Sequence, residues 1–169
     1  MTRLEGKQDA TGWVEDPVLR HRLRFTRSNG EQQVEIWVDP GGGVTPHVHP
    51  GLEERFEVLE GRPGFLSGRK WQEAGPGDTV VVPAGVRHSY RNRENAPVRM
   101  VCRVTPPSSS LQEFLEEVAA LSRAGKMSRR GFPKGPRAAL AGASLLRRHR
   151  EMVRMRPLAL PIPRRRTSQ

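Results

Sequence analysis

The stretch Gly41-Gly-Gly-Val-Thr-Pro-His47-Val-His49-Pro-Gly-Leu-Glu-Glu54-Arg-Phe-Glu-Val-Leu-Glu-Gly61 decides the fold of this chain. His47 and His49 lie two residues apart, and a strand would point both imidazoles to the same face. Glu54 begins a segment of strand-like composition, so its carboxylate could approach the pair. His88 comes from further along the chain and adds a third imidazole. Three neutral imidazoles and one carboxylate suit one divalent transition metal such as Mn, Fe, Ni or Zn.

A His-x-His pair alone is a weak signal, because two histidines on one strand face are more often surface or core residues than ligands. The chain has only five histidines, however, and His47, His49 and His88 are three of them. Glu53 is the alternative carboxylate, but it should point away from the pair if Glu54 points inward, since neighbouring residues of a strand face opposite sides.

Two motifs now identify a family. Residues 41–61 read Gly41-x5-His47-x-His49-x4-Glu54-x6-Gly61, and residues 77–92 read Gly77-x5-Pro83-x-Gly85-x2-His88-x3-Asn92. Together they resemble, position for position, the two consecutive motifs of the cupin superfamily, and the resemblance covers about residues 15 to 106. It implies a double-stranded β-helix, or jelly roll, with His47, His49, Glu54 and His88 as metal ligands inside a small barrel.

The hydrophobic pattern agrees with that fold. Leu19 to Phe25 and Val34 to Val38 alternate apolar and polar residues on either side of Asn29-Gly30, which suits a two-residue hairpin turn. Short strands with Gly and Pro turns, and no helical period before Thr105, indicate an antiparallel all-β domain. The same alternation predicts side chains that line a cavity beside the ligands: Phe56, Val58, Tyr90, Met100, Cys102 and His21.

Three of these residues have competing interpretations. Tyr90, with His21 as a weaker second, is the candidate for a catalytic group that donates a hydrogen bond in the cavity, although a tyrosine packed at the barrel rim fits equally well. His21 lies on an apolar strand face, which favours a buried, hydrogen-bonded structural histidine over a pocket role. Cys102 is favoured as a small core residue over a redox thiol.

The chain after Thr105 differs in composition. Residues 1–106 are nearly neutral, so almost all of the net charge of +11 belongs to residues 107–169. Ser110-Leu-Gln-Glu113 reads as a capping box for a helix with an apolar stripe that ends at Gly125, and residues 137–156 read as a second helix. We therefore expect a cupin barrel over 1–106 and a basic helical extension over 107–169.

The basic extension could attract phosphates, but no base-reading motif or row of aromatic residues accompanies its arginines. We favour a solvated basic helix over nucleic-acid binding. No run of 18 apolar residues predicts a membrane span, no leader-like segment precedes the domain, and the single cysteine fits a reducing compartment. These features predict a cytoplasmic protein.

The functional expectation is a mononuclear metal cupin that acts on a small molecule. A divalent ion with one carboxylate ligand has a net charge near +1, which favours an anionic or chelating partner such as an enolate, phenolate or hydroxy acid. Dioxygenase, decarboxylase and isomerase chemistry all remain open, and a non-catalytic sensor or carrier is the alternative. We favour the enzyme narrowly. We expect a homodimer, because the apolar stripe of the helix over residues 111–121 and the outward faces of the small β-sandwich need covering.

Overall fold

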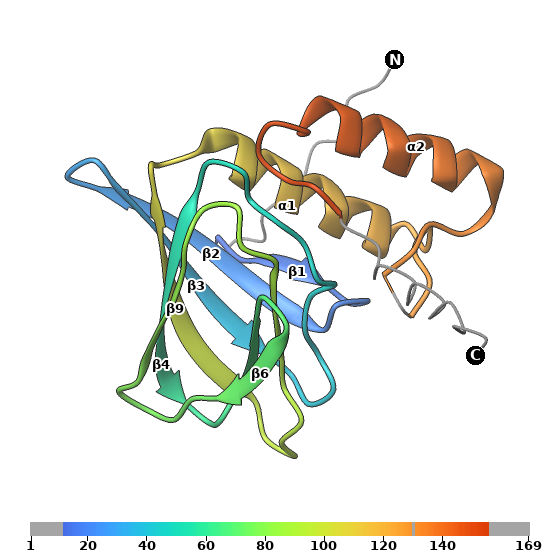
Figure 1. Ribbon diagram of the computed structural model, residues 1–169. Helices are drawn as coiled ribbons and strands as arrows, with labels where there is room; N and C mark the ends of the chain where they lie inside the picture. Colours follow the sequence, from blue (N-terminus) through green and yellow to red (C-terminus); the bar gives the residue numbers. More distant parts are fainter. Residues whose placement is uncertain (1–11, 130, 156–169) are drawn as a thin grey trace, which may run out of the picture.

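The computed structural model describes residues 12–129 and 131–155, and it folds as a β-barrel with two helices packed beside it (Figure 1). The predicted fold class, an all-β jelly roll with a C-terminal helical extension, is confirmed. In chain order the elements are β1 (Val14–Asp16), β2 (His21–Ser28), β3 (Glu31–Val38), β4 (Glu53–Glu60), β5 (Gly64–Ser67), β6 (Lys70–Glu73), β7 (Thr79–Val82), β8 (His88–Arg91), β9 (Val98–Thr105), α1 (Ser109–Arg123) and α2 (Gly135–Arg148).

The larger of two sheets is antiparallel and has the strand order β1-β2-β3-β9-β4-β7. Its register aligns Val34, Cys102, Phe56 and Val80 across four strands, and all four side chains are buried. Glu54 lies two residues before Phe56, at the start of β4, and therefore shares its buried face. The alternation seen in the sequence thus delivers the carboxylate to the inside of the barrel.

The smaller sheet has the order β6-β5-β8, and the segment between β3 and β4 joins its edge. His47 forms two backbone hydrogen bonds with His88, at 3.0 and 2.9 Å, so the first and second motifs are paired directly. Gly43 pairs with Arg91 in the same way. Because Gly43 has a φ of 153° and a Cβ there would lie 2.5 Å from the Tyr90 carbonyl oxygen, only glycine fits this approach.

The predicted hairpin at Asn29-Gly30 is confirmed, and the chain contains another between β5 and β6. β2 and β3 are joined by Asn29 and Gly30, whose φ angles of 53° and 78° are the left-handed values that a type I′ turn requires. β5 and β6 form the second hairpin, and Gly68 lies in its turn with a φ of 60°.

The extension differs in detail from the prediction. α1 is capped by the hydroxyl of Ser108, which accepts a hydrogen bond from the Leu111 N–H, so the prediction of Ser110 as the cap was wrong. The Ser110 hydroxyl instead bonds the side chain of His149. The second helix is also shorter than predicted: it ends at Arg148, because the chain turns at His149, whose carbonyl accepts the N–H groups of Met152 and Val153.

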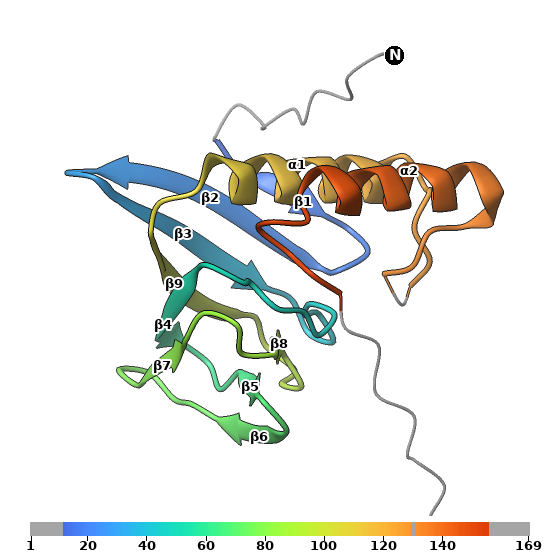
Figure 2. The ribbon, with the colours of Figure 1, turned by 45° about the horizontal axis from the view of Figure 1, so that its top comes forward.

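After this turn residues 150–155, the returning segment, run back between the helices and the barrel, as Figure 2 shows. Arg154 forms two backbone hydrogen bonds with Val48, at 3.0 and 2.9 Å. Val48 lies between the two histidines of the first motif, so the returning segment of the extension adds a short strand-like pairing beside the candidate ligands.

The hydrophobic core is continuous between the barrel and the extension. Leu111 and Ala119 of α1 and Met152 and Val153 of the returning segment belong to the same buried cluster as the strand residues. The stripe of α1 is therefore covered within one chain. This removes one of the two reasons to expect a homodimer, and the homodimer stays a prediction.

Within residues 12–129 and 131–155, no helix is long and apolar enough to cross a lipid bilayer. Several arginines of the predicted basic tail, including Arg164 to Arg166, lie outside the described residues.

Candidate metal centre

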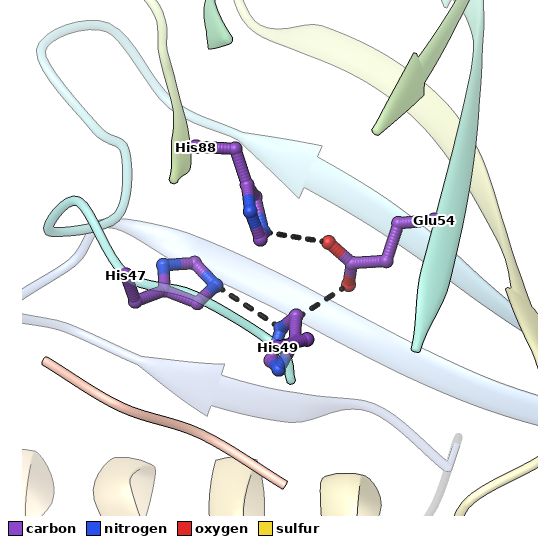
Figure 3. Close-up of side chains that lie close together, drawn as sticks. All are labelled: His47, His49, Glu54 and His88. Carbon is purple, nitrogen blue, oxygen red and sulfur yellow. Dashed lines mark hydrogen bonds and ion pairs between the residues drawn. The ribbon is translucent and has the colours of Figure 1, made fainter. Parts of the chain in front are cut away.

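Four side chains from three segments of the chain converge inside the barrel (Figure 3). His47 and His49 come from the segment before β4, Glu54 from β4 and His88 from the start of β8. One potential ligand atom from each of them lies within 4.8 Å of all the others. His49, Glu54 and His88 are buried and His47 is partly buried, so the cluster could hold a metal ion at the base of a pocket. Glu53, which the sequence placed on the opposite face, is not a member of the cluster.

Each imidazole is oriented by a backbone carbonyl. The Nδ1–H groups of His47, His49 and His88 donate to the carbonyl oxygens of Thr45, Met152 and Val86, at 2.9, 2.8 and 2.9 Å. In a neutral imidazole with a proton on Nδ1, the Nε2 atom presents a lone pair. All three rings therefore turn a potential ligand atom toward the cluster, and their tautomers are fixed by the fold.

The atoms that meet at the centre of the cluster are acceptors. His47 Nε2 lies 3.1 Å from His49 Nε2, and His88 Nε2 lies 2.8 Å from Glu54 Oε2. His88 Nε2 and Glu54 Oε2 are both buried, and apart from each other they have no hydrogen-bond partner among the described residues. Lone pairs that face one another in a buried site require a cation or a proton between them. The donor set, three imidazoles and a carboxylate, fits a divalent transition metal.

The electrostatics of the cluster keep His47 and Glu54 in forms that bind cations. Burial, followed by repulsion from His88 and His49, lowers the pKa of His47 to about 3. Burial alone would raise the pKa of Glu54, but the hydrogen bond with His88 and the charges of the histidines outweigh it and lower this pKa to about 2. Burial would lower the pKa of His88, yet Glu54 raises it overall, so His88 is the imidazole that pairs with the carboxylate when it takes up a proton.

Tyr90 and His21 form a hydrogen-bonded pair next to the cluster. The Tyr90 hydroxyl lies 2.9 Å from His21 Nδ1, and both residues are buried. Burial, followed by the charge of Glu54, raises the pKa of Tyr90 well above its usual value of 10. Burial also lowers the pKa of His21 to about 4, against an opposing effect of Asp16. The pair is consequently neutral near pH 7.

A cavity of about 410 Å³ extends from the cluster to the helices. Its barrel side contains the four clustered residues together with Phe56, Tyr90 and Cys102. Its other side is made by the extension, through the apolar side chains Leu111, Phe114, Leu115, Val118, Leu121, Leu145, Leu146, Val153 and Met155. The volume lies in the range of small-molecule sites.

The remaining predicted pocket residues lie elsewhere. Val58 and Met100 pair with each other across β4 and β9 and are almost fully buried, but they do not line this cavity. They lie on the same face of the sheet as Phe56 and Cys102 but two residues further along their strands from the ligands. The alternation of side chains along a strand predicts the face, but it does not predict the distance from the ligands. His21 likewise lies behind Tyr90 instead of in the cavity wall. Burial raises the pKa of the Cys102 thiol, as expected of a core residue.

Sequence reasoning missed the contribution of the extension to this site. The stripe on α1 predicted packing but carried no sign of a cavity, and the Met152 carbonyl that orients His49 has no sequence signature at all. Met152 and Val153 fell inside the predicted second helix, so the sequence analysis gave no sign that the chain returns to the core.

Comparison with known proteins agrees with the geometry. The family described as "Cupin domain" matches residues 34–104, which include all four clustered residues. An uncharacterized protein of Methanocaldococcus jannaschii is 32% identical over 94 residues, which are 54% of this chain and 75% of the relative.

Solved structures resemble the fold. KdgF from Halomonas sp. has a TM-score of 0.53 at 19% identity, and the match covers 59% of this chain and 89% of that chain. An RmlC-like cupin from Shewanella frigidimarina has a TM-score of 0.51 at 21% identity, covering 57% and 86%. At these identities the likeness concerns the fold alone.

Proposed function

The chain belongs to the cupin family, and from this premise we propose that it is a mononuclear metal protein that acts on a small, anionic or chelating molecule. His47, His49, Glu54 and His88 are the proposed ligands. The observation that carries the proposal is the convergence of three carbonyl-oriented imidazoles and one carboxylate on a single buried point. Such a donor set suits Mn, Fe, Ni or Zn.

When bound, a divalent metal supplies Lewis-acid polarisation of a coordinated oxygen, or redox chemistry if it is iron or manganese. The chain's own residues provide the rest of the site. Glu54 remains ionised and lowers the net charge of the centre. The apolar walls exclude water, which strengthens the electrostatic interactions inside. The Tyr90 hydroxyl, held by His21, is the proposed hydrogen-bond donor to the substrate.

The proposed reaction is of the dioxygenase, decarboxylase or isomerase type. A non-catalytic carrier or sensor is the second candidate, and one observation favours it: outside the cluster, the described cavity residues that carry an O–H or S–H group are few, namely Thr45, Tyr90, Cys102 and Ser122. We favour the enzyme, because a metal with four protein ligands retains positions at which substrate or oxygen can bind.

Metal analysis of the purified protein tests the ligand assignment. We expect about one divalent transition metal per chain, with near-complete loss in His47→Ala and His88→Ala. Glu53→Ala is the matched control, because Glu53 adjoins Glu54 in sequence but faces away from the cluster. Full metal content in the His88 variant would refute the assignment.

Turnover separates enzyme from carrier. Protein loaded in turn with Fe, Mn, Ni and Zn should convert at least one member of a panel of enolic, catecholic and hydroxy-acid substrates, with oxygen uptake if the reaction is oxidative. A carrier would instead bind one small anion saturably, gain thermal stability with ligand and release it unchanged. If the protein binds an anion and releases it unchanged with every metal, the enzyme proposal is wrong.

We further propose a homodimer in the cytoplasm. Two exposed apolar side chains, Trp71 on β6 and Val81 on β7, support the homodimer. The single cysteine, which is buried and free, supports the cytoplasmic location. Light scattering of the purified protein would settle the first, and a monomer at micromolar concentration would contradict it.

A further inference from the structure

We propose that the ligand is an anionic amphiphile, with a metal-binding head at the histidine cluster and an apolar body held between the barrel and the helical extension. This inference rests on the proposed function, because the head is placed at the proposed metal site. It adds the chemical class of the rest of the molecule, and it assigns α1, α2 and the returning segment as the part of the protein that selects it.

The first argument is the contrast between the two sides of the cavity. The barrel side carries the polar groups of His47, His49, Glu54, His88 and Tyr90, set among apolar side chains such as Leu23, Ile36 and Phe56. The side made by the extension is almost entirely apolar, with Phe114 and Leu115 from α1 and Leu146 from α2. A wholly polar small acid would leave the second side without a partner. A molecule with a chelating head and an apolar body matches both sides.

The second argument is the size of the space. Protein interiors are close-packed, and voids much larger than a water molecule are few because each one forfeits packing energy. A cavity of about 410 Å³ with apolar walls lies between elements that otherwise share one core. The helices could have closed on the barrel with larger side chains. Instead α2 presents small side chains to this space at Ala139 and Ala143, and both are exposed.

The third argument is the apolar edge of the cavity. Phe132 and Met155 line it and are nevertheless 56% and 39% exposed. Large apolar side chains that are exposed beside a cavity are typical of a path for an apolar ligand. Both residues belong to the extension, one in the loop between the helices and one in the returning segment.

The charge of the head follows from what the cavity contains. Among the described residues that line it, none is lysine or arginine. An anionic head could therefore be neutralised only at the cluster, where a divalent ion with Glu54 has a net charge near +1. One further polar atom lies in the helical wall, since the Ser122 hydroxyl is buried and has no partner among the described residues. A body with one polar substituent would satisfy it.

The test is a chain-length series of 2-hydroxy acids, from 2-hydroxybutanoate to 2-hydroxydecanoate, titrated calorimetrically into the full-length protein loaded with Zn. Each methylene that enters the apolar part should increase affinity roughly fourfold, as expected for burial of one such group. The increase should stop when the cavity is full. Affinity that does not change with chain length, in protein with full metal content, would overturn the inference and leave the proposed function standing.

Two variants of α2 make the test specific. Leu146→Phe, at a half-buried residue of α2 that lines the cavity, should fill part of the space, so that affinity stops rising at a shorter chain length, while the metal content stays near that of the parent. Leu140→Phe is the control, because Leu140 is 76% exposed on the same helix and does not line the cavity. An unchanged chain-length limit in the Leu146 variant would also overturn the inference. If the protein binds no metal and its affinity for the acids still rises with chain length, both the position proposed for the anionic head and the proposed function are wrong.

Discussion

His49 donates its Nδ1–H to the backbone carbonyl of Met152, at 2.8 Å, so a proposed metal ligand in the first motif is oriented by a residue more than a hundred positions later. The returning segment that carries Met152 is held on both sides of this contact, by the Val48–Arg154 pairing and by the hydrogen bonds to the His149 carbonyl. The extension is therefore part of the proposed centre, although it supplies no ligand.

Loosening the turn after α2 should weaken metal binding at a distance. The His149 side chain joins the two helices, through Ser110 at 2.8 Å and Glu117 at 3.4 Å. In His149→Ala, we expect the metal dissociation constant to rise about tenfold, because residues that orient ligands typically contribute 10–100-fold in affinity. A competition assay with a chelating dye measures this. Arg150→Ala, an exposed neighbour, should change nothing; equal affinities in parent and His149 variant would show that the turn does not support His49.

The close approach of Gly43 to β8 should tolerate no side chain. A Cβ there would lie 2.5 Å from the Tyr90 carbonyl oxygen and 2.9 Å from the Arg91 Cα, and the φ of 153° is itself unfavourable for other residues. Gly43→Ala should cost on the order of 3 kcal/mol in unfolding free energy. Urea denaturation gives the value. Gly51→Ala, where a Cβ would meet no atom within 4 Å, should stay within about 0.5 kcal/mol of the parent; similar losses in both would contradict the clash.

Stability should fall in acid because of His21. Unfolded His21 takes up a proton near pH 6.5, whereas the folded residue resists protonation until about pH 4. The unfolded state therefore binds more protons between these values, and the free energy of unfolding should drop as pH falls from 6.5 to 4, by up to about 3 kcal/mol from this residue. Above pH 6.5 the residue adds no pH dependence.

The measurement compares the parent with His21→Gln by urea denaturation at pH 7.5, 5.5 and 4.5, both in excess chelator so that metal release does not contribute. The variant should lose less stability on acidification than the parent. Parallel pH profiles would mean that folded His21 is protonated as readily as the unfolded residue.

The Cys102 thiol should be inert in the native protein. It is buried among strand residues, and burial raises its pKa, so little thiolate is present at pH 8. A disulfide-exchange reagent should label it only as fast as the chain unfolds, with the full reaction restored in denaturant. Rapid labelling under native conditions would return Cys102 to the group of candidate redox residues.

The barrel and its cluster could be predicted because their determinants are local and periodic. A strand repeats every two residues, so Glu54 fixed the side of Phe56, and the motif spacing identified His88. Depth along the barrel has no such period, which is why Val58 and Met100 were placed in the cavity wall although they lie one row beyond it. The cap at Ser108 was missed because Ser108 and Ser110 both precede the same apolar stripe, and packing against His149 decides between them.

The Met152 contact also determines when the site can be completed during synthesis. A ribosome makes the four proposed ligands well before it makes the carbonyl that holds one of them, since translation proceeds from the N-terminus. A nascent barrel would present His49 with its ring free to rotate, and the pocket would still lack its helical wall. The hydrogen bond that orients His49 can therefore form only after the chain has been synthesised as far as Met152 and the extension has packed on the barrel.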